Sequence, residues 1–384
     1  MVGRCTPVWM VTIVCLAGCL QSNKTVIDSA EDVQKLDACK ALIRSLQNED
    51  LPALQSIDTW RGKYGPGLRL TTAHYEIYTT LLDPLTLGQI PGFMESAYCA
   101  YNRQLPEPVE TTGKFRIYLF ADRQQWEDFT ETFAGERAEI FYKIKAGAYY
   151  LNGACVTYNI GRSRTLSALG HEGWHQFNSR HFKFRLPSWL DEGIAMLFET
   201  SRSDGGLFYF EPNQNELRLE GLKETLICSQ QIPLSELVAM NPGEVLAIDQ
   251  AEAVRAFYSQ SYALVRFLQE SGYGKHQNNF CRLLLDSLRG DWPLSRTIRK
   301  VAADRNIPRT VEWNRLVGPQ LFRQYISSDI DRLETEYLAF CRQIAGRAPL
   351  MAQSQIEGFH TTVRFALSEP DGLLPCTDQP SNAR

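Results

Sequence analysis

The order of hydrophobic and polar residues divides this chain into an N-terminal region of strands and helices and a C-terminal region of helices. In the first region, apolar residues alternate where a strand is predicted and recur at helical spacing where a helix is predicted. Strands are expected at residues 71–80 and 114–120, and helices at 91–105 and 123–133. Two short apolar runs within 148–160 flank Asn152 and Gly153, a strong signal for a β-hairpin.

Helical periodicity dominates after residue 163. We expect helices at residues 164–178, 189–200, 252–270, 276–289, 294–304 and 310–343. Pro187 marks a break before the second of these helices, and Ser188 is its expected N-cap. Residues 201–215 are rich in glycine and polar residues, which favours a surface loop. The whole pattern predicts an α+β fold, with a small mixed sheet followed by a mainly helical C-terminal half.

The N-terminal segment has the features of an export signal. Arg4 precedes an apolar run from Val8 to Ala17, which is too short to cross a bilayer. The run ends in the letters LAGC, which resemble a bacterial lipobox with Cys19 as its cysteine. The resemblance implies lipid attachment to Cys19 and an anchor in the bacterial cell envelope, facing the periplasm or the exterior. A plain secretory signal with an incidental cysteine is the alternative.

Charge and cysteine content narrow the function classes. The formal net charge of −4 becomes −5 when the single positive charge of Arg4 leaves with the signal. No long basic run follows, so nucleic acid is not an expected partner. Of the 10 cysteines, two precede Cys19 and seven follow it, without any CxxC pair. A cysteine zinc cluster is therefore unsupported, while disulfides and buried thiols both remain open.

The segment from His171 to His175 carries the strongest chemical signal. Its letters, HEGWH, place two histidines four residues apart, and in a helix such residues project from one face toward a single ion. Glu172 lies beside the first histidine, where a carboxylate can accept a proton from a water that the metal activates. With 6 histidines and 44 acidic residues in the chain, random placement gives about 0.01 such matches. We therefore interpret the segment as a catalytic zinc (Zn2+) site.

A catalytic zinc ion usually has three protein ligands and leaves one position open. Glu192 is the expected third ligand, since it lies on the next predicted helix, and the small Gly193 would let that helix approach the first. Asp191 is a weaker candidate, because neighbouring helix positions point about 100° apart. His181, six residues after the second histidine, is a further alternative, although it lacks the glycine usual in the wider histidine motifs.

Together these motifs resemble the gluzincin, or peptidase MA, group of metallopeptidases, and most closely the DUF1570-type domain of bacterial proteins. The resemblance runs from about residue 71 to about residue 268 and includes HYEIYTT at 74–80, the zinc motif, PSWLDEGIA at 187–195 and YSQSYALVRFL at 258–268. It implies zinc ligation by His171, His175 and Glu192, with Glu172 as general base. It also implies an edge strand that binds an extended peptide by strand addition.

In related gluzincins, a tyrosine from a later helix can stabilise the oxyanion. Tyr258 is the expected candidate here and Tyr262 the second, although both lie on an amphipathic stripe where core packing is the simpler role. Some gluzincins also place an acid four residues after the glutamate ligand to support a histidine. This chain has Met196 at that position, and Glu199, seven residues after the ligand, is the expected substitute.

These expectations divide the chain into five segments. They are a lipoprotein signal peptide at 1–18, a tether and short helix at 19–65, an N-terminal α/β part with the edge strand at 66–162, a helical metallopeptidase part at 163–345, and a tail at 346–384. The end of the tail is dominated by proline, glycine, serine and aspartate and is expected to be disordered.

The favoured function is that of a lipid-anchored extracytoplasmic zinc metallopeptidase acting on a peptide or protein substrate. The alternative is a catalytically inactive peptidase-fold binding module in the cell envelope, against which the intact Glu172 argues. A third interpretation, a structural protein whose zinc only joins two helices, requires a fourth protein ligand that the sequence does not offer. The sequence leaves the oligomeric state and the cleavage specificity undetermined.

Overall fold

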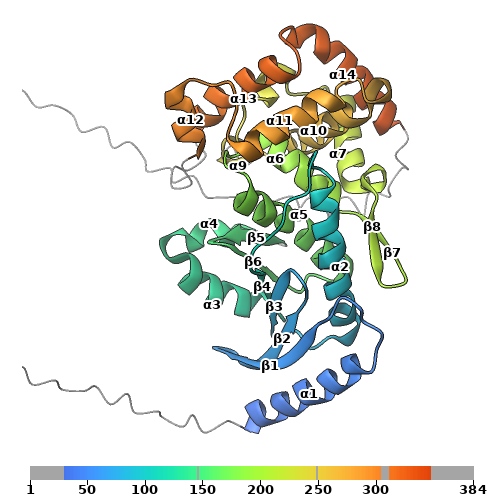
Figure 1. The fold of residues 1–384 in the computed structure, drawn as a ribbon, viewed down its shortest axis with the longest axis vertical. Coiled ribbons are helices and arrows are strands. Elements are labelled where there is room, and N and C mark those ends of the chain that lie inside the picture. The colour runs from blue at the N-terminus through green and yellow to red at the C-terminus, as the bar shows by residue number, and fades with distance from the viewer. Residues whose placement is uncertain (1–29, 145–146, 248–249, 304–310, 347–384) are drawn as a thin grey trace, which may run out of the picture.

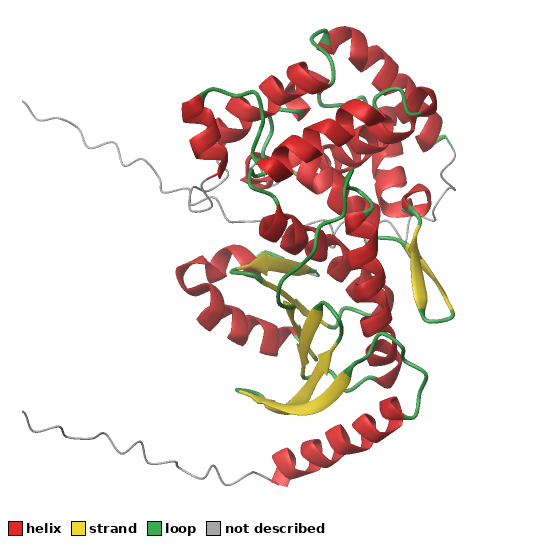
Figure 2. Ribbon diagram, viewed as in Figure 1, coloured by secondary structure: helices red, strands yellow, loops and turns green. Residues whose placement is uncertain are grey.

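The computed structural model describes residues 30–144, 147–247, 250–303 and 311–346. Within these ranges a mixed sheet occupies one end of the molecule and a group of helices the other (Figure 1). The predicted α+β fold, with a small mixed sheet and a helical C-terminal half, is confirmed (Figure 2). The predicted signal peptide, Cys19 and the tail after residue 346 lie outside the described residues.

The N-terminal part of the structure alternates strands and helices. The strands are β1 (Ser56–Gly62), β2 (Gly65–Thr71), β3 (Tyr75–Thr79), β4 (Phe115–Phe120), β5 (Ala148–Leu151) and β6 (Ala154–Tyr158). The helices are α1 (Ala30–Gln47), α2 (Pro84–Asn102), α3 (Arg123–Ala134) and α4 (Ala138–Tyr142). The strands form one sheet in the order β1-β2-β3-β4-β6-β5, in which β3, β4 and β6 are parallel and the other pairs antiparallel. β5 is therefore an edge strand.

Helices cover both faces of the sheet because its central strands carry apolar residues on both sides. On β4, Phe115 lies against Tyr98 of α2, with ring centroids 6.4 Å apart. Tyr118 points to the opposite face, where its ring centroid is 4.7 Å from that of Phe129 in α3. Helix α5 (Arg162–His181) follows β6 and packs against β5 and β6. The sheet thus supports the helix that carries the HExxH motif.

The turn between β5 and β6 is the one that the sequence predicted. Asn152 and Gly153 both have positive φ, at 48° and 80°. A two-residue hairpin turn of this kind requires positive φ at both positions, which asparagine tolerates and glycine adopts freely. The turn sets the register in which Tyr150 is opposite Cys155. It therefore brings β5 to the sheet edge beside α5.

The segment predicted to hold a tether and a short helix contains the helix α1 and the strand β1. Helix α1 has 18 residues and buries Cys39, Leu42 and Leu46 as it packs against β1 and β2. β1 pairs with β2 over its full length, from Ser56 opposite Thr71 onward. Most residues of β1 are exposed or half-buried, as expected of an edge strand, so its hydrophobic alternation is weak. The sheet thus begins at residue 56, and the tether prediction does not hold from there to residue 65.

The C-terminal half is built around one long buried helix. Its helices are α6 (Ser188–Ala195), α7 (Glu216–Ile227), α8 (Leu234–Leu237), α9 (Pro242–Ala247), α10 (Ala251–Glu270), α11 (Gln277–Arg289), α12 (Arg296–Ala303), α13 (Val311–Tyr325) and α14 (Ile330–Ala345). α10 packs against α6, α7 and α14. The single helix predicted at 310–343 is two helices, because Asp329 caps the second by accepting a hydrogen bond from the Arg332 N–H.

The glycine-rich segment after α6 forms a β-hairpin, whereas a surface loop was predicted. β7 (Ser201–Asp204) and β8 (Leu207–Phe210) are antiparallel, and Gly205 and Gly206 join them with positive φ. Phe208 fixes the hairpin against α2, with its ring centroid 5.2 Å from that of Phe93. Four apolar or aromatic residues follow one another in β8, so the strand lacks the alternation of apolar and polar residues by which a strand is predicted.

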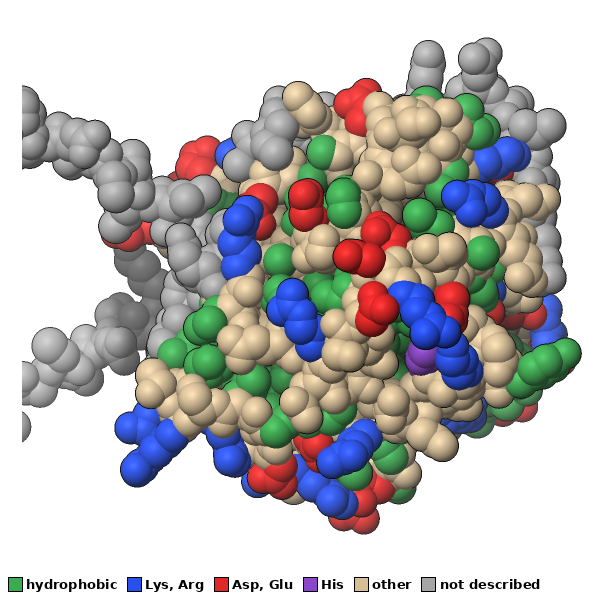
Figure 3. Space-filling view, turned by 90° about the horizontal axis from the view of Figure 1, so that it is seen from above, with side chains coloured by type: hydrophobic (Ala, Val, Ile, Leu, Met, Phe, Trp, Pro, Cys, Tyr) green, Lys and Arg blue, Asp and Glu red, His purple; other side chains and the backbone are tan. Residues whose placement is uncertain are grey.

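Every cysteine in the described ranges is a free thiol. They are Cys39, Cys99, Cys155, Cys228, Cys281 and Cys341, of which three are buried. Burial of thiols is thus the alternative that the structure supports for these positions. Within the same ranges, every helix is too short or too polar to cross a bilayer. The face of the helical half seen in Figure 3 carries interspersed acidic and basic side chains.

Candidate metal centre

Two consecutive helices bring the three predicted ligands together. α5 supplies His171 and His175, and α6 supplies Glu192. All three side chains are buried, and their ligand atoms lie within 4.8 Å of one another. Glu192 Oε2 is 3.3 Å from His171 Nε2 and 3.7 Å from His175 Nε2. The structure therefore assembles the sequence-predicted ligand set at one point.

The start of α6 is fixed by a distant residue, which corrects the predicted N-cap. Ser188 is the first residue of the helix, and Pro187 occupies the cap position without a side-chain hydrogen bond. The backbone N–H of Ser188 donates to Asn314 Oδ1 of α13 at 2.9 Å. Asn314 thus satisfies the N–H of the first helical residue, one of the donors at a helix start that have no partner within the helix.

Glu172 lies beside the ligand cluster and is fully buried. Burial raises the pKa of its carboxyl to about 7, against the opposing charges of His175 and His171. The backbone of Tyr150 also acts to lower this pKa, so the edge strand β5 runs next to the carboxyl. A group whose pKa is near neutrality can accept a proton and return it at physiological pH.

Each histidine turns its other ring nitrogen toward a carboxylate. His175 Nδ1 is 3.1 Å from Asp191 Oδ1, and His171 Nδ1 is 2.9 Å from Glu199 Oε1. Because carboxylates only accept hydrogen bonds, an imidazole that is neutral, as a metal ligand must be, would carry its hydrogen on Nδ1 and leave its Nε2 lone pair toward Glu192. Glu199 therefore has the supporting position expected of it. Asp191 supports a histidine and is not one of the clustered ligand groups.

Asp191 also ties α6 to α5. Its Oδ1 atom accepts hydrogen bonds from Trp174 Nε1 at 3.0 Å and from Asn178 Nδ2 at 2.7 Å, besides facing His175. These donors all lie on α5, and all are buried. A buried carboxylate with several charge-assisted hydrogen bonds holds a fixed orientation. The position of neighbouring Glu192 over the two histidines follows from this anchorage.

Glu199 is held in turn by residues that sequence reasoning missed. Arg218 of α7 donates to it from Nε at 2.8 Å and from a terminal nitrogen at 2.5 Å. Asn215 Nδ2 adds a hydrogen bond at 2.8 Å. Asn215 is also the N-cap of α7, a role that its residue type and the following glutamate could have indicated. The sequence offers no comparable signal for Arg218.

The carboxyl groups of the centre have different charge states. Burial acts to raise the pKa of Glu192, but His175 and His171 outweigh it and lower that pKa to about 2. Burial likewise opposes ionisation of Glu199, whose pKa Arg218 and His171 lower to about 2. Glu172, in contrast, has a pKa of about 7. Glu192 and Glu199 are therefore anionic at neutral pH, whereas the carboxyl of Glu172 can change its protonation state there.

The cluster fits a metal ion because buried polar atoms converge there. His175 Nε2 and both carboxylate oxygens of Glu192 are buried without a hydrogen-bond partner in the described part of the chain. Leaving such an atom unsatisfied costs about 1–3 kcal/mol, and more for a charged group. A cation at the centre would satisfy all of them. Two imidazole nitrogens and one carboxylate form a donor set that catalytic zinc accepts.

Two glycines allow close contacts around the centre. A Cβ atom on Gly173 would lie 2.4 Å from the hydroxyl of Tyr101, which donates to the Gly170 carbonyl at 2.7 Å. A Cβ atom on Gly193 would lie 2.6 Å from the Ser261 carbonyl of α10. Gly193 was expected to let α6 approach α5. The helix that it admits is α10.

The two candidate tyrosines have different surroundings. Both are buried. Burial, followed by the charge of Glu192, raises the pKa of Tyr258 well above its ordinary value, so this side chain lies near Glu192. The hydroxyl of Tyr262 instead donates to the Pro212 carbonyl and accepts from Arg266 at 3.0 Å. Tyr262 thus belongs to a separate hydrogen-bonded group.

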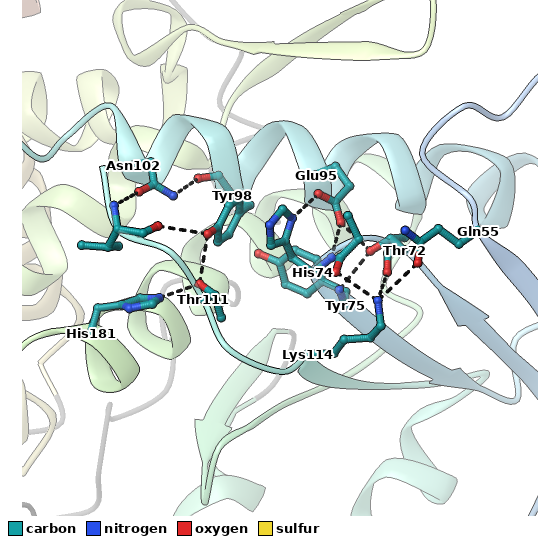
Figure 4. A network of polar contacts seen from close by, with 12 residues as sticks. Gln55, Thr72, His74, Tyr75, Glu95, Tyr98, Asn102, Thr111, Lys114 and His181 are labelled. Atoms are coloured by element: carbon teal, nitrogen blue, oxygen red, sulfur yellow. Dashed lines mark hydrogen bonds and ion pairs between the residues drawn. The ribbon is translucent and has the colours of Figure 1, made fainter. Parts of the chain in front are cut away.

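His181 does not join the ligand cluster. Its Nε2 is 2.8 Å from Thr111 Oγ1, in a polar network that continues to Tyr98 and Asn102 (Figure 4). Burial lowers the pKa of His181 to about 4. This histidine contributes to the packing of α5 on the neighbouring loop, and the alternative in which it replaces Glu192 as third ligand is wrong.

A scan of protein-family models, a search of curated proteins and a search of solved structures each return no match to this chain.

Proposed function

We propose that this protein is a zinc-dependent metallopeptidase of the gluzincin type, similar to the DUF1570-type domain of bacterial proteins. The observation that carries the proposal is the meeting of His171, His175 and Glu192 within 4.8 Å, with Glu172 buried beside them. A structural zinc site usually has four protein ligands, and among the described residues this group contains three. The donor set therefore favours a catalytic site over a purely structural one.

The chemistry of the site divides between zinc and the side chains of the protein. Zinc, when bound, supplies a Lewis acid that activates water and polarises a substrate carbonyl. Glu172, with its pKa of about 7, accepts a proton from the attacking water and returns it to the leaving nitrogen. Tyr258 donates a hydrogen bond to the substrate oxygen on which negative charge develops. Asp191 and Glu199 keep the two histidines oriented.

The edge strand supports a peptide as substrate. β5 pairs with β6 on one side only, and the backbone of its Tyr150 acts to lower the pKa of the Glu172 carboxyl, so the strand runs close to that carboxyl. An extended peptide can add to a free strand edge, where main-chain hydrogen bonds give affinity without selecting one side-chain sequence. A peptide on β5 would bring a backbone carbonyl within reach of the general base.

We also propose that the protein is exported and carries lipid on Cys19. The basis is the apolar run from Val8 to Ala17 and the lipobox-like residues that follow it. Lipid on both the sulfur and the new amino terminus gives durable anchoring, where one acyl chain gives only reversible binding. The substrate would then be a peptide or protein outside the cytoplasm.

The test measures bound zinc and cleavage of a mixed peptide library by wild type, Glu172→Gln and Glu192→Ala. We expect wild type to bind zinc and to cleave. Glu172→Gln should keep the metal and lose at least about 100-fold in turnover, because it removes the proton acceptor. Glu192→Ala should lose zinc. Glu95→Gln removes a carboxylate that pairs with His74 at 2.6 Å, outside the centre, and serves as the control.

Each variant has an outcome that contradicts its assignment. Unchanged turnover in Glu172→Gln would exclude the general-base role. Full zinc occupancy in Glu192→Ala would remove that residue from the ligand set. A wild-type protein that binds zinc but cleaves no peptide would favour the binding module over the enzyme.

A further inference from the structure

We propose that Arg218 is a positioning residue of the metal centre, which fixes Glu199 behind His171 and thereby sets how tightly the site holds a divalent cation. The inference rests on the proposed zinc site and concerns a residue that no motif marks. Arg218 comes from α7, which follows the β7–β8 hairpin, and so belongs to neither ligand helix.

The contact between Arg218 and Glu199 is bidentate. Arg218 Nε donates to Glu199 Oε2 at 2.8 Å, and a terminal guanidinium nitrogen donates to Oε1 at 2.5 Å. Both side chains are buried, and Arg218 keeps 2% of its surface exposed. A two-point contact of planar groups fixes the plane of the carboxylate as well as its position. A lysine at this position would supply the charge without that constraint.

One oxygen atom links this contact to the metal ligand. Glu199 Oε1 accepts from Arg218 and also lies 2.9 Å from His171 Nδ1. A rotation of the carboxylate would therefore turn the imidazole and displace its Nε2, which lies 3.3 Å from Glu192 Oε2. In metal sites, removing the partner of the non-ligating ring nitrogen weakens metal affinity by about 10- to 100-fold. Arg218 acts one contact further from the ion.

The charge of the surroundings gives a second reason. Four carboxyl groups are buried around the centre, those of Glu172, Asp191, Glu192 and Glu199. Arg218 brings a permanent positive charge to the last of them. If that charge were removed, Glu199 would be left as a poorly compensated buried anion, and a shift of its carboxylate away from His171 would be favoured.

The chain contains a matched control in Arg266. This arginine is also buried, makes two contacts with the carboxylate of Glu270 at 2.7 and 2.8 Å, and stacks over Tyr262. Arg218 stacks over Tyr258 in the same way, with 5.4 Å from the guanidinium carbon to the ring centroid, compared with 5.5 Å for Arg266. Only the Arg218 pair contacts a proposed metal ligand.

The test determines zinc affinity by competition with a chelator for wild type, Arg218→Gln, Glu199→Gln, the double variant and Arg266→Gln. Cobalt(II) in place of zinc gives an absorption spectrum that reports the coordination geometry. We expect Arg218→Gln and Glu199→Gln each to weaken zinc binding by about 10-fold or more and to alter the cobalt spectrum. The double variant should be no more than about 3-fold weaker than Glu199→Gln, because both act through one contact. Arg266→Gln should bind as wild type does.

Three results would overturn the inference. The first is a zinc affinity within about 3-fold of wild type in a folded Arg218→Gln variant. The second is a loss of zinc affinity in the double variant that equals the sum of the two single losses in free energy. The third is a loss of zinc affinity in Arg266→Gln equal to that in Arg218→Gln. If Arg218→Gln does not fold, Arg218→Lys is compared with Arg266→Lys. Since lysine keeps the charge and loses the fork, wild-type affinity in Arg218→Lys would exclude orientation by Arg218.

The same measurements separate this inference from the proposed function. A wild-type protein that binds no zinc overturns both. A wild-type protein that binds zinc and cleaves peptides, with Arg218→Gln unchanged in affinity and spectrum, overturns the inference alone.

Discussion

Replacing Gly173 by alanine should destabilise this protein, although alanine is the better helix former. In an exposed helix the substitution gains about 1 kcal/mol. Here the new Cβ atom would lie 2.4 Å from the hydroxyl oxygen of Tyr101 and 3.2 Å from the ring carbon that bears it. Tyr101 is fully buried, and its hydroxyl donates to the Gly170 carbonyl at 2.7 Å. The tyrosine would therefore have to move within a packed core.

The size of the effect follows from two losses and one gain. Overpacking of a buried site costs about 1–3 kcal/mol. Breaking the hydrogen bond of a buried hydroxyl costs about 1–3 kcal/mol more. After the gain in helix propensity is subtracted, Gly173→Ala should lower the free energy of unfolding by about 1–5 kcal/mol.

The assay is urea unfolding of wild type, Gly173→Ala, Tyr101→Phe and the double variant, followed by circular dichroism. Tyr101→Phe removes the oxygen with which the Cβ atom clashes and by itself costs about one buried hydrogen bond, about 1–2 kcal/mol. In the double variant the 2.4 Å contact is absent and the 3.2 Å contact with the ring carbon remains, so Gly173→Ala should cost less stability in the Tyr101→Phe background than in wild type. A Gly173→Ala variant more stable than wild type, or two single effects that add in the double variant, would refute the steric argument.

Two further predictions concern single side chains. Tyr258→Phe should lower turnover by about 100- to 1,000-fold with unchanged zinc content, because it removes one hydrogen-bond donor to the oxyanion. Tyr262→Phe should leave turnover per folded molecule unaffected. Equal losses of turnover in both variants would argue against the assignment of Tyr258. The pKa of His181 is lowered to about 4 in the folded protein from an ordinary 6.5. As the pH falls, His181 is therefore protonated in the unfolded chain before it is protonated in the folded one. The stability that the folded protein has above pH 6.5 is lost as the pH falls toward 4. His181→Gln should reduce this acid loss in urea midpoints measured at pH 7 and pH 4.5, and an undiminished loss would contradict the prediction.

Elements with a strong local pattern could be predicted from the sequence. β4 begins one residue after its predicted start, and the hairpin around Asn152 and Gly153 forms as expected. In both cases the signal is local. For β4 it is the alternation of apolar and polar residues, and for the hairpin it is a turn conformation that few residue types adopt readily. β1 and β8 escaped prediction because their residues do not alternate. Strand β1 is stabilised by pairing with β2, and β8 by packing on α2.

The candidate site divides in the same way. A spacing of four residues in a helix is enough to put His171 and His175 on one face and Glu172 beside them. The sequence pattern also identified Glu192 and Glu199. It misassigned the contact of Gly193, because a glycine shows that something approaches closely without showing which helix does so.

The sequence by itself determined the helix that carries the HExxH motif, the acidic residues that follow it and the overall α+β class. These depend on helix geometry and local hydrophobic periodicity, which act over a few residues. Only the tertiary structure decided that Arg218 secures Glu199, 19 residues away and beyond a hairpin, and that Tyr258 lies near Glu192 while Tyr262 joins Pro212 and Arg266. Such contacts depend on how whole elements pack together. The order of residues along the chain contains no local signal of that packing.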